Sequence, residues 1–221
     1  MPQLFTEKSA LNDFSPPKSE PDSLENYVIV EKLHTGRWNT AYIAVIKGNF
    51  SSKYIIRKYL NINIQKYNLQ KDLIDKQRLL ISLNYCQYCS VRTKCKLFPE
   101  TRSIFYDENR NLYFVQEFVT GIELSDVMTH FPNGLPETAV IFISAQVLIA
   151  MEYLHRANIL VRDIHANGII VQRNGFIRIC SMTFGEVLEI DYSSSKSMKG
   201  RVAFFPPEFL VKHIWTKEAD C

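Results

Sequence analysis

The sequence is poor in glycine and has little excess of charge of either sign. Its 221 residues include 8 glycines, about half of the roughly 7% that is usual in proteins. The formal net charge is +3, from 26 Lys and Arg against 23 Asp and Glu, which argues against a dedicated nucleic-acid or membrane-surface binder. Hydrophobic residues make up 46% of the chain and charged residues 22%. These values indicate a globular protein and exclude a wholly disordered chain.

The sequence also predicts neither a secretory signal nor a membrane span. Lys8 and Asp13 interrupt the first residues, so we expect no signal peptide there. The most apolar stretch, 139–154, contains serine, glutamine and glutamate, and we interpret it as too short and too polar to cross a bilayer. The five cysteines are an odd number without a secretory signal. We therefore expect reduced thiols and a cytoplasmic or nuclear location.

The order of the expected elements places strands before helices. Residues 1–25 hold four prolines and four serines and predict a flexible leader. Alternation and turn residues then predict three strands at 27–32, 41–48 and 53–60, with a turn at 48–52. A helix is predicted at 68–83, followed by two more strands at 102–107 and 112–118. A long helix follows from Pro136-Glu137, with a hairpin at Asn174-Gly175. The sequence predicts an α+β protein in two lobes, with a hinge near 117–124.

Four segments, taken in order, resemble the protein kinase family. LYFVQEFVTGIEL is similar to the kinase hinge, and SAQVLIAMEYLH to the long helix of the cAMP-dependent (AGC) branch of Ser/Thr kinases. LVRDIHANGIIV resembles the catalytic loop, and GRVAFFPPEFL the end of the activation segment. The resemblance implies a kinase-like domain over 26–221, with a β-rich N-lobe over 26–118. It also implies a helical C-lobe over 124–221 that is truncated before its central helix is complete.

Phosphate binding is implied for a glycine loop and for a cation on a strand. Only Gly36 remains of the three loop glycines, and His34 and Asn39 replace the others; a plain β-hairpin turn is the alternative interpretation. The strand lysine of the family corresponds to Arg57 or Lys58, depending on the register. We prefer Arg57, because the other register would point Arg57 into the core of the lobe.

The resemblance also implies an adenine and ribose pocket. Its positions correspond to Ala41, Ile55, Gln116, Glu117, Val119, Glu123 and Ile170. Ile55 replaces a small alanine and should narrow the nucleotide pocket. The helix glutamate that pairs with the strand cation falls at Asp75 or Lys76. Ordinary surface charges on a helix are the alternative for both residues.

The catalytic positions are only partly retained. Asp163 occupies the position of the residue that accepts the proton of the substrate hydroxyl; a structural loop carboxylate that binds backbone N–H groups is the alternative. Of the two metal ligands, the asparagine is Gly168, and the aspartate is Ser181, or Thr183 in a shifted alignment. Mg²⁺ sites normally use carboxylates, so no metal site is predicted.

Two further groups of residues have a regulatory or metal-binding interpretation. Arg162 and Ser197 match the arginine and the activating phosphorylation site of AGC kinases; a solvated serine run is the alternative for Ser197. Cys86, Cys89 and Cys95 are three thiols within ten residues, which we interpret as free thiols rather than as a zinc site.

The resemblance and its departures together predict a pseudokinase. Such a protein keeps the kinase scaffold as a binding or allosteric module and has little or no Mg²⁺-dependent phosphoryl transfer. ATP binding without Mg²⁺ is left open. We expect a protein partner, such as an active kinase or a kinase substrate, and neither nucleic acid nor a membrane. A weak or atypical Ser/Thr kinase that uses Asp163 and a non-functional truncated fragment are the alternatives.

Overall fold

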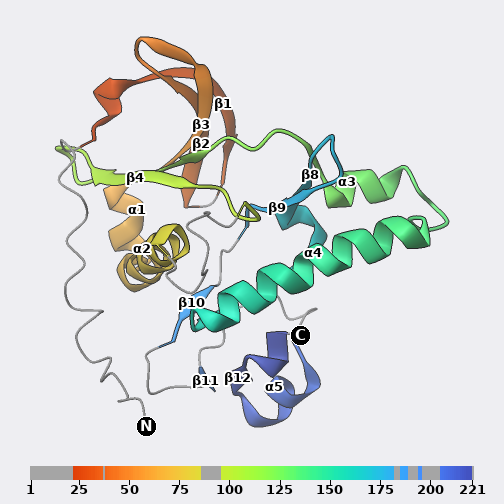
Figure 1. The fold of residues 1–221 in the computed structure, drawn as a ribbon. Helices are drawn as coiled ribbons and strands as arrows, with labels where there is room; N and C mark the ends of the chain where they lie inside the picture. The colour runs from red at the N-terminus through yellow and green to blue at the C-terminus, as the bar shows by residue number, and fades with distance from the viewer. Residues whose placement is uncertain are drawn as a thin grey trace, which may run out of the picture.

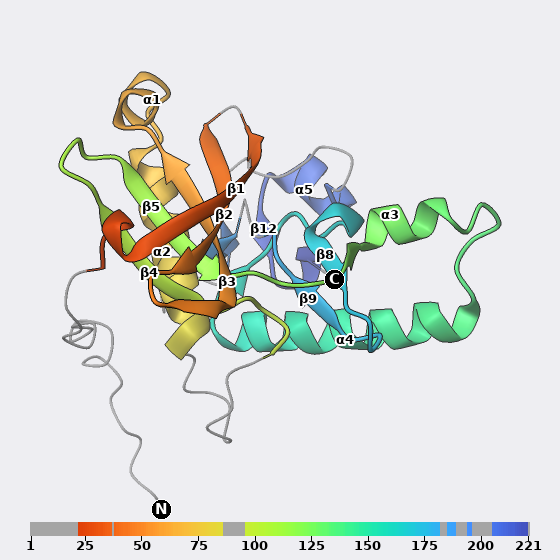
Figure 2. The same cartoon turned by 90° about the horizontal axis from the view of Figure 1, so that it is seen from above.

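The computed structural model describes residues 22–36, 38–85, 96–181, 185–188, 194–195 and 205–220. Figures 1 and 2 show a β-sheet with α2 at one end of the molecule and the helices α3, α4 and α5 away from it. The N-terminal elements are β1 (Tyr27–Thr35), β2 (Asn39–Ile46), β3 (Asn49–Tyr59), α1 (Asn61–Lys66), α2 (Gln70–Tyr85), β4 (Thr101–Tyr106) and β5 (Leu112–Glu117). The predicted α+β order, strands first and helices later, is confirmed.

The second half of the chain contains the long helix and several two- and three-residue strands. Its elements are β6 (Ile122–Glu123), α3 (Leu124–Thr129), α4 (Glu137–Arg156), β7 (Ile159–Leu160), β8 (Ile169–Val171), β9 (Ile177–Ile179), β10 (Glu186–Val187), β11 (Ser194–Ser195), α5 (Pro207–Lys212) and β12 (Trp215–Thr216). A 3-10 turn at Ala166–Gly168 lies between β7 and β8, and another at Glu218–Asp220 follows β12. The hairpin predicted at Asn174-Gly175 is confirmed as β8–β9, with Gly175 at a φ of 83° that favours glycine.

The five-stranded sheet has the order β1-β2-β3-β5-β4, and its paired strands are antiparallel. Alternation along β3 sends Ile56 into a cluster on the outer face with Ala44 and Val115. Tyr59 and Phe114 point to the opposite face and pack with the leucines of α2. Because side chains of a strand alternate between faces, this register also sets the direction of the charged residues of β3.

The main hydrophobic core joins the two halves of the molecule. Leu79 of α2, Phe114 of β5, Leu154 of α4 and Ile177 of β9 belong to one buried cluster. Burial of side chains of this size stabilises the fold by roughly 1.5–3 kcal/mol each. The cavity described below lies beside this core, so its walls come from rigid elements.

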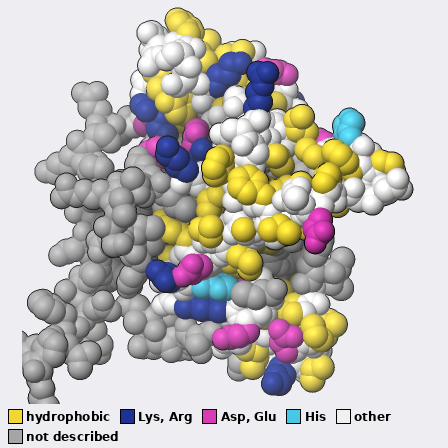
Figure 3. Space-filling model, turned by 45° about the vertical axis from the view of Figure 1, so that its right-hand side comes forward, with side chains coloured by type: hydrophobic (Ala, Val, Ile, Leu, Met, Phe, Trp, Pro, Cys, Tyr) yellow, Lys and Arg dark blue, Asp and Glu magenta, His cyan; other side chains and the backbone are white. Residues whose placement is uncertain are grey.

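The sequence of α4 predicts an apolar face through Val140, Ile143, Val147, Ala150, Met151 and Leu154, and the structure confirms it except at Val140. Ala150, Met151 and Leu154 are buried, whereas Val140 is 45% exposed. The other exposed large apolar residues of α4 are Ile141, Phe142, Leu148 and Ile149. Figure 3 shows hydrophobic side chains gathered over α3 and α4. The expectation for Val140 is therefore wrong, whereas Ile143 and Val147 pack against the main core.

By length and composition, α4 is also sufficient to cross a membrane, with 20 residues from Glu137 to Arg156. The interpretation of 139–154 as too short and too polar is therefore wrong on those two criteria. The result is weak support for a span, since core helices of soluble proteins meet the same criteria. Only 22% of the most apolar window is buried.

Two segment boundaries differ from the sequence predictions. The turn expected at 48–52 is shorter, because Asn49–Tyr59 is strand and Gly48 alone takes a positive φ of 79°. The end of the predicted leader is held in place by Asp22, whose carboxylate accepts hydrogen bonds from Tyr27 and Ser103. The rest of the predicted leader, 1–21, lies outside the described residues.

Candidate functional site

A cavity of about 200 Å³ lies where α2 meets the inner face of the sheet. Strands β1, β2, β3 and β5, helix α2 and the end of β9 contribute side chains to it. Its polar lining consists of His34, Asn39, Arg57, Lys76, Gln116 and Ser181. Of the residues predicted for phosphate and nucleotide binding, Arg57 and Gln116 line this cavity.

The register of β3 places Arg57, and not Lys58, in the cavity. Arg57 lies opposite Phe114, whose ring belongs to the inner face. Lys58 points to the other face, where its Nζ atom lies 5.5 Å from the ring centroid of Tyr113. Arg57 Nη1 donates a hydrogen bond to Gln116 Oε1, and burial lowers the pKa of the Arg57 guanidinium. A guanidinium remains charged even so.

Lys76, and not Asp75, is the charged residue of α2 that lines the cavity together with Arg57. Lys76 Nζ donates a hydrogen bond of 3.2 Å to the Tyr59 hydroxyl, and it lies 5.7 Å from the ring centroid of Phe114. Of the two residues that the sequence left open, Lys76 lines the cavity and Asp75 does not. Lys76 therefore adds a second cation to the lining of the cavity, whereas the family resemblance implies a glutamate on this helix.

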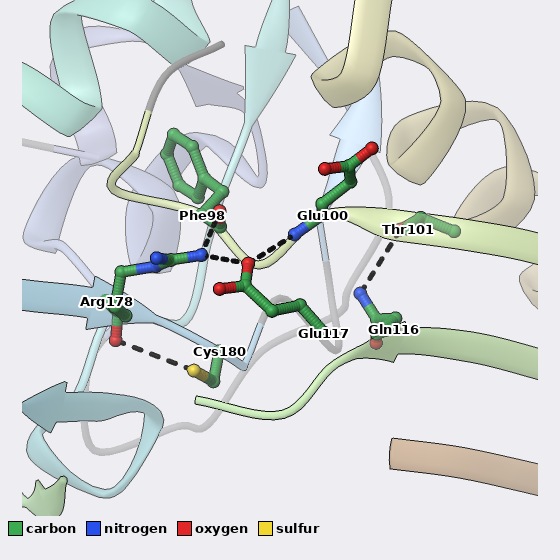
Figure 4. Close-up of polar contacts among 7 residues, drawn as sticks. All are labelled: Phe98, Glu100, Thr101, Gln116, Glu117, Arg178 and Cys180. Carbon is green, nitrogen blue, oxygen red and sulfur yellow. Dashed lines mark hydrogen bonds and ion pairs between the residues drawn. The ribbon is translucent and has the colours of Figure 1, made fainter. Parts of the chain in front are cut away.

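The hinge is tied to the β8–β9 hairpin through Glu117 (Figure 4). Glu117 Oε2 accepts hydrogen bonds from Arg178 Nη2 and from the backbone N–H of Glu100, the latter at 3.2 Å. The same Arg178 nitrogen donates to the carbonyl of Phe98 at 3.0 Å. The Glu117 side chain therefore joins the two lobes in this structure.

The remaining residues predicted for the adenine and ribose pocket do not line the cavity. Ala41 and Val119 are buried, and Ile55 and Ile170 are partly buried, while Glu123 is exposed. Gly36 also lies outside the lining. Its backbone N–H donates to the Asn39 carbonyl at 2.8 Å, which closes the turn of a β-hairpin between β1 and β2.

The two predicted metal-ligand positions lie in direct contact. The Gly168 carbonyl accepts hydrogen bonds from the backbone N–H groups of Cys180 at 2.7 Å and Ser181 at 3.3 Å. A Cβ atom added at Gly168 would lie only 2.7 Å from Ser181 Cβ. The space for a ligand side chain at 168 is therefore taken by Ser181. Thr183, the alternative ligand, lies outside the described residues.

No group of three or more His, Cys, Asp or Glu side chains suited to a metal ion occurs in the described part of the chain. Cys86, Cys89 and Cys95 lie outside that part, so the zinc interpretation stays a prediction. Cys180 is a free thiol at the cavity. Burial raises the pKa of this thiol to about 11.

Asp163 is buried in the loop that follows β7. Only 2% of its side chain is exposed, and its Oδ2 atom lies 3.6 Å from Nε2 of His165. The loop itself is held by Asp220, whose two carboxylate oxygens accept the backbone N–H groups of Val161 at 2.7 Å and Arg162 at 2.8 Å. The role of Asp220 was not predicted from the sequence, because its partners are 58 and 59 residues away.

Arg162 forms an ion pair within the described chain. Its Nη1 atom lies 2.6 Å from Glu186 Oε2, and the Arg162 side chain is 1% exposed. Glu186 also accepts a hydrogen bond of 2.6 Å from the Ser195 hydroxyl. Ser197, the predicted phosphorylation site, lies outside the described residues. Glu186 was missed by sequence reasoning, since nothing in the motif spacing pairs it with Arg162.

Comparisons with known proteins agree on one family. The family model for the protein kinase domain matches residues 36–221. A probable serine/threonine-protein kinase of Dictyostelium discoideum is 29% identical over 170 residues, which are 77% of this chain and 34% of that protein. Protein kinase C-like 1 of Saccharomyces cerevisiae is 26% identical over 219 residues, 97% of this chain and 18% of that protein.

A cAMP-dependent protein kinase catalytic subunit, from Arthrobotrys oligospora, is 24% identical over 202 residues, which are 90% of this chain and 35% of that protein. AGC-like kinases are thus among the relatives, at low identity. The chain spans between 18% and 35% of the length of these three relatives.

Proposed function

The chain belongs to the protein kinase family, and we propose that it is a pseudokinase, a binding or allosteric module with little or no Mg²⁺-dependent phosphoryl transfer. The observation that carries this proposal is the contact between Gly168 and Ser181. Glycine offers no side-chain oxygen, and a Cβ atom at 168 would lie 2.7 Å from Ser181 Cβ. The serine hydroxyl is a weak, neutral ligand for Mg²⁺.

Loss of both ligands removes the largest source of charge neutralisation in the reaction. Phosphoryl transfer depends on positioning and on metal ions that offset the charge of the transferred group. The residues present at 168 and 181 do not fit a magnesium site. The scaffold around these positions, in contrast, is packed and hydrogen-bonded.

The surroundings of Asp163 support a structural role for its carboxylate. A general base must come within about 2.6–3.2 Å of the proton that it accepts. The Asp163 side chain is 2% exposed and lies against His165, which supports a structural role within the loop. Removal of Asp163 is then expected to affect the loop more than any transfer reaction.

A binding module acts through other molecules, and we extend the proposal to a protein partner in the cytoplasm or nucleus. The exposed apolar side chains of α4, such as Ile141, Leu148 and Ile149, support an interaction surface on this helix. Apolar patches on a folded protein commonly mark binding sites.

Radiolabelled ATP tests the proposal directly. The purified chain is incubated with Mg²⁺ or Mn²⁺ and a mixed peptide substrate, beside the Asp163→Ala variant. Glu152→Ala is the matched control, since Glu152 is an exposed carboxylate on α4 that is 60% exposed. We expect no transfer above the Asp163→Ala background in any sample. Robust transfer that Glu152→Ala keeps and Asp163→Ala abolishes would establish the alternative, a weak or atypical Ser/Thr kinase.

A further inference from the structure

We propose that the ion pair between Glu117 and Arg178 is a latch that restricts how far the two lobes can move apart. Glu117 ends β5, the last strand of the first lobe, and Arg178 lies in β9 of the second lobe. Of the ion pairs in the described part of the chain, this is the one that joins the two lobes. The latch acts on the motion of the lobes, so it does not depend on the pseudokinase proposal.

The Arg178 end of the latch is fixed by the main core. The neighbouring residues of β9, Ile177 and Ile179, are 1% and 2% exposed and belong to the main hydrophobic cluster. Because successive side chains of a strand point to opposite faces, burial of these two isoleucines directs Arg178 away from that cluster and towards the hinge (Figure 4). Arg178 therefore cannot turn aside without a change in the packing of β9.

The Glu117 end of the latch is fixed by the five-stranded sheet. The Glu117 backbone N–H donates to the Glu100 carbonyl at 2.8 Å, and Glu117 lies opposite Tyr54 of β3. Both ends of the latch are thus mounted on strands of different lobes. A movement that separates these strands must break the ion pair, because each side chain is held by its own strand.

A third segment, 98–100, takes part in the latch. Arg178 Nη2 donates to Glu117 Oε2 and to the Phe98 carbonyl, the latter at 3.0 Å. Glu117 Oε2 also accepts a hydrogen bond from the Glu100 N–H at 3.2 Å. One nitrogen and one oxygen thus connect the hinge, the segment before β4 and the β8–β9 hairpin (Figure 4). Such directed bonds resist rotation of the lobes, whereas the hydrophobic contacts of the shared core are non-directional.

Partial burial makes the latch stronger than an ordinary surface ion pair. The Arg178 side chain is 12% exposed and the Glu117 side chain is 41% exposed. Fully exposed pairs contribute little to stability, but the attraction between two charges rises several-fold as water is excluded. Arg178 Nε is already buried without a hydrogen-bond partner among the described residues. Loss of the Glu117 carboxylate would therefore leave a largely buried guanidinium with its charge uncompensated, which is unfavourable.

The latch determines which molecules can change the arrangement of the lobes. A ligand shifts a conformational equilibrium only by its difference in affinity for the two states. A molecule that requires the lobes to separate must therefore supply the free energy that breaks the latch. A molecule that fits the arrangement in Figure 1 does not have to supply it.

Hydrogen exchange of single amides, followed by NMR on the whole chain, tests the proposal. The Ile179 N–H donates to the Leu97 carbonyl at 2.7 Å across the two lobes, so its exchange rate reports their separation. The Ile177 N–H donates to Gln146 Oε1 at 2.9 Å within the second lobe. The exchange rate of Ile177 is therefore the internal reference.

We expect Glu117→Gln and Arg178→Gln each to raise the exchange rate of Ile179 at least about tenfold relative to that of Ile177, because each variant removes charge-assisted hydrogen bonds. Glutamine at 117 keeps the size of the side chain, and circular dichroism identifies a variant that does not fold. The double variant should exchange no faster than the faster single variant, because both changes break the same contact.

Glu123→Gln and Arg173→Gln are the matched controls, since they change an exposed charge in the hinge and in the β8–β9 hairpin. Both controls should keep the wild-type exchange rates. A measurement on the wild type needs no variant. About 1 M potassium chloride should accelerate the exchange of Ile179 relative to Ile177, because salt screens a partly exposed ion pair.

The proposal is overturned if folded Glu117→Gln or Arg178→Gln, or salt on the wild type, leaves the ratio of the two exchange rates unchanged. It is equally overturned if Ile177 accelerates as much as Ile179, since this indicates a general loosening of the fold. Effects of the two substitutions that multiply in the double variant would also contradict a shared contact. None of these outcomes involves phosphoryl transfer, so the pseudokinase proposal stands or falls separately.

Discussion

Replacement of Gly168 by alanine tests whether the metal-ligand positions are closed by packing. The new Cβ atom would lie 2.7 Å from Ser181 Cβ and 3.6 Å from Ser181 Cα. Carbon atoms in favourable contact are about 3.5–4.0 Å apart, so the two segments must separate by about 1 Å. That movement strains the hydrogen bond of 2.7 Å between the Cys180 N–H and the Gly168 carbonyl.

The expected loss of stability follows from these contacts. Overpacking of a filled site costs about 1–3 kcal/mol, and the lower entropy of the unfolded alanine chain offsets about 0.4–1 kcal/mol of it. We therefore expect Gly168→Ala to lower the free energy of unfolding by about 1–2 kcal/mol in urea titrations. In a protein of this size, that corresponds to a fall in melting temperature of roughly 2–8 °C.

Two further variants isolate the contact itself. Gly36→Ala is the control, since the nearest atom to its new Cβ would be 3.5 Å away, an ordinary contact. Ser181→Gly removes the atom that Gly168→Ala meets, so the double variant should recover stability, with a coupling energy of about 0.5–3 kcal/mol. If Gly168→Ala is as stable as the wild type, or if the two changes are additive, the positions are not closed by this contact.

Two other predictions concern the catalytic loop and the cavity thiol. Asp220→Ala leaves the buried N–H groups of Val161 and Arg162 without their acceptor, so we expect the free energy of unfolding in urea to fall by about 2–4 kcal/mol. Glu218→Ala, at an exposed neighbouring position, is the control and should change that free energy by less than about 0.5 kcal/mol. Equal effects of the two variants would contradict the anchoring role of Asp220. Burial raises the pKa of Cys180 from 9.0 to about 11. At pH 8 the Cys180 thiol should therefore react with iodoacetamide far more slowly in the native protein than in urea. Mass spectrometry of the peptide that contains Cys180 measures both rates. The native state binds the thiol proton more tightly between those pKa values, so stability should fall as pH rises from 9 towards 11; equal labelling of native and unfolded chains would contradict this burial.

Much of the fold could be predicted from local patterns, because its strands and its long helix show hydrophobic periodicity between residues that are close in the sequence. Strands β2 and β5, which lie on either side of the central strand β3, and the helix α4 begin within two residues of the predicted positions. Helix α1 was not predicted, because its six residues, Asn61–Lys66, are too few for a helical period to be recognised. The division into two lobes was predicted from the order of the four kinase-like segments.

The site could be predicted only in part, because its decisive contacts join distant segments. A shift of one residue in β3 would exchange Arg57 for Lys58, and only the pairing of Arg57 with Phe114 of β5 determines the face. The choice between Asp75 and Lys76 likewise depends on how α2 rotates against the sheet. The contact between Gly168 and Ser181 has no counterpart in the spacing of either motif.

The two departures from kinase chemistry are complementary in charge. In the family pattern a strand lysine pairs with a helix glutamate, and metal ions neutralise much of the phosphate charge. At the two positions where the resemblance implies metal ligands, this chain has Gly168 and Ser181, neither of which is a carboxylate or an amide. The exchange of glutamate for Lys76 adds two units of positive charge at the wall of the cavity, and Arg57 keeps its own. Under the proposal of a pseudokinase, the absence of a carboxylate at positions 168 and 181 and the presence of Lys76 both disfavour metal-dependent phosphoryl transfer.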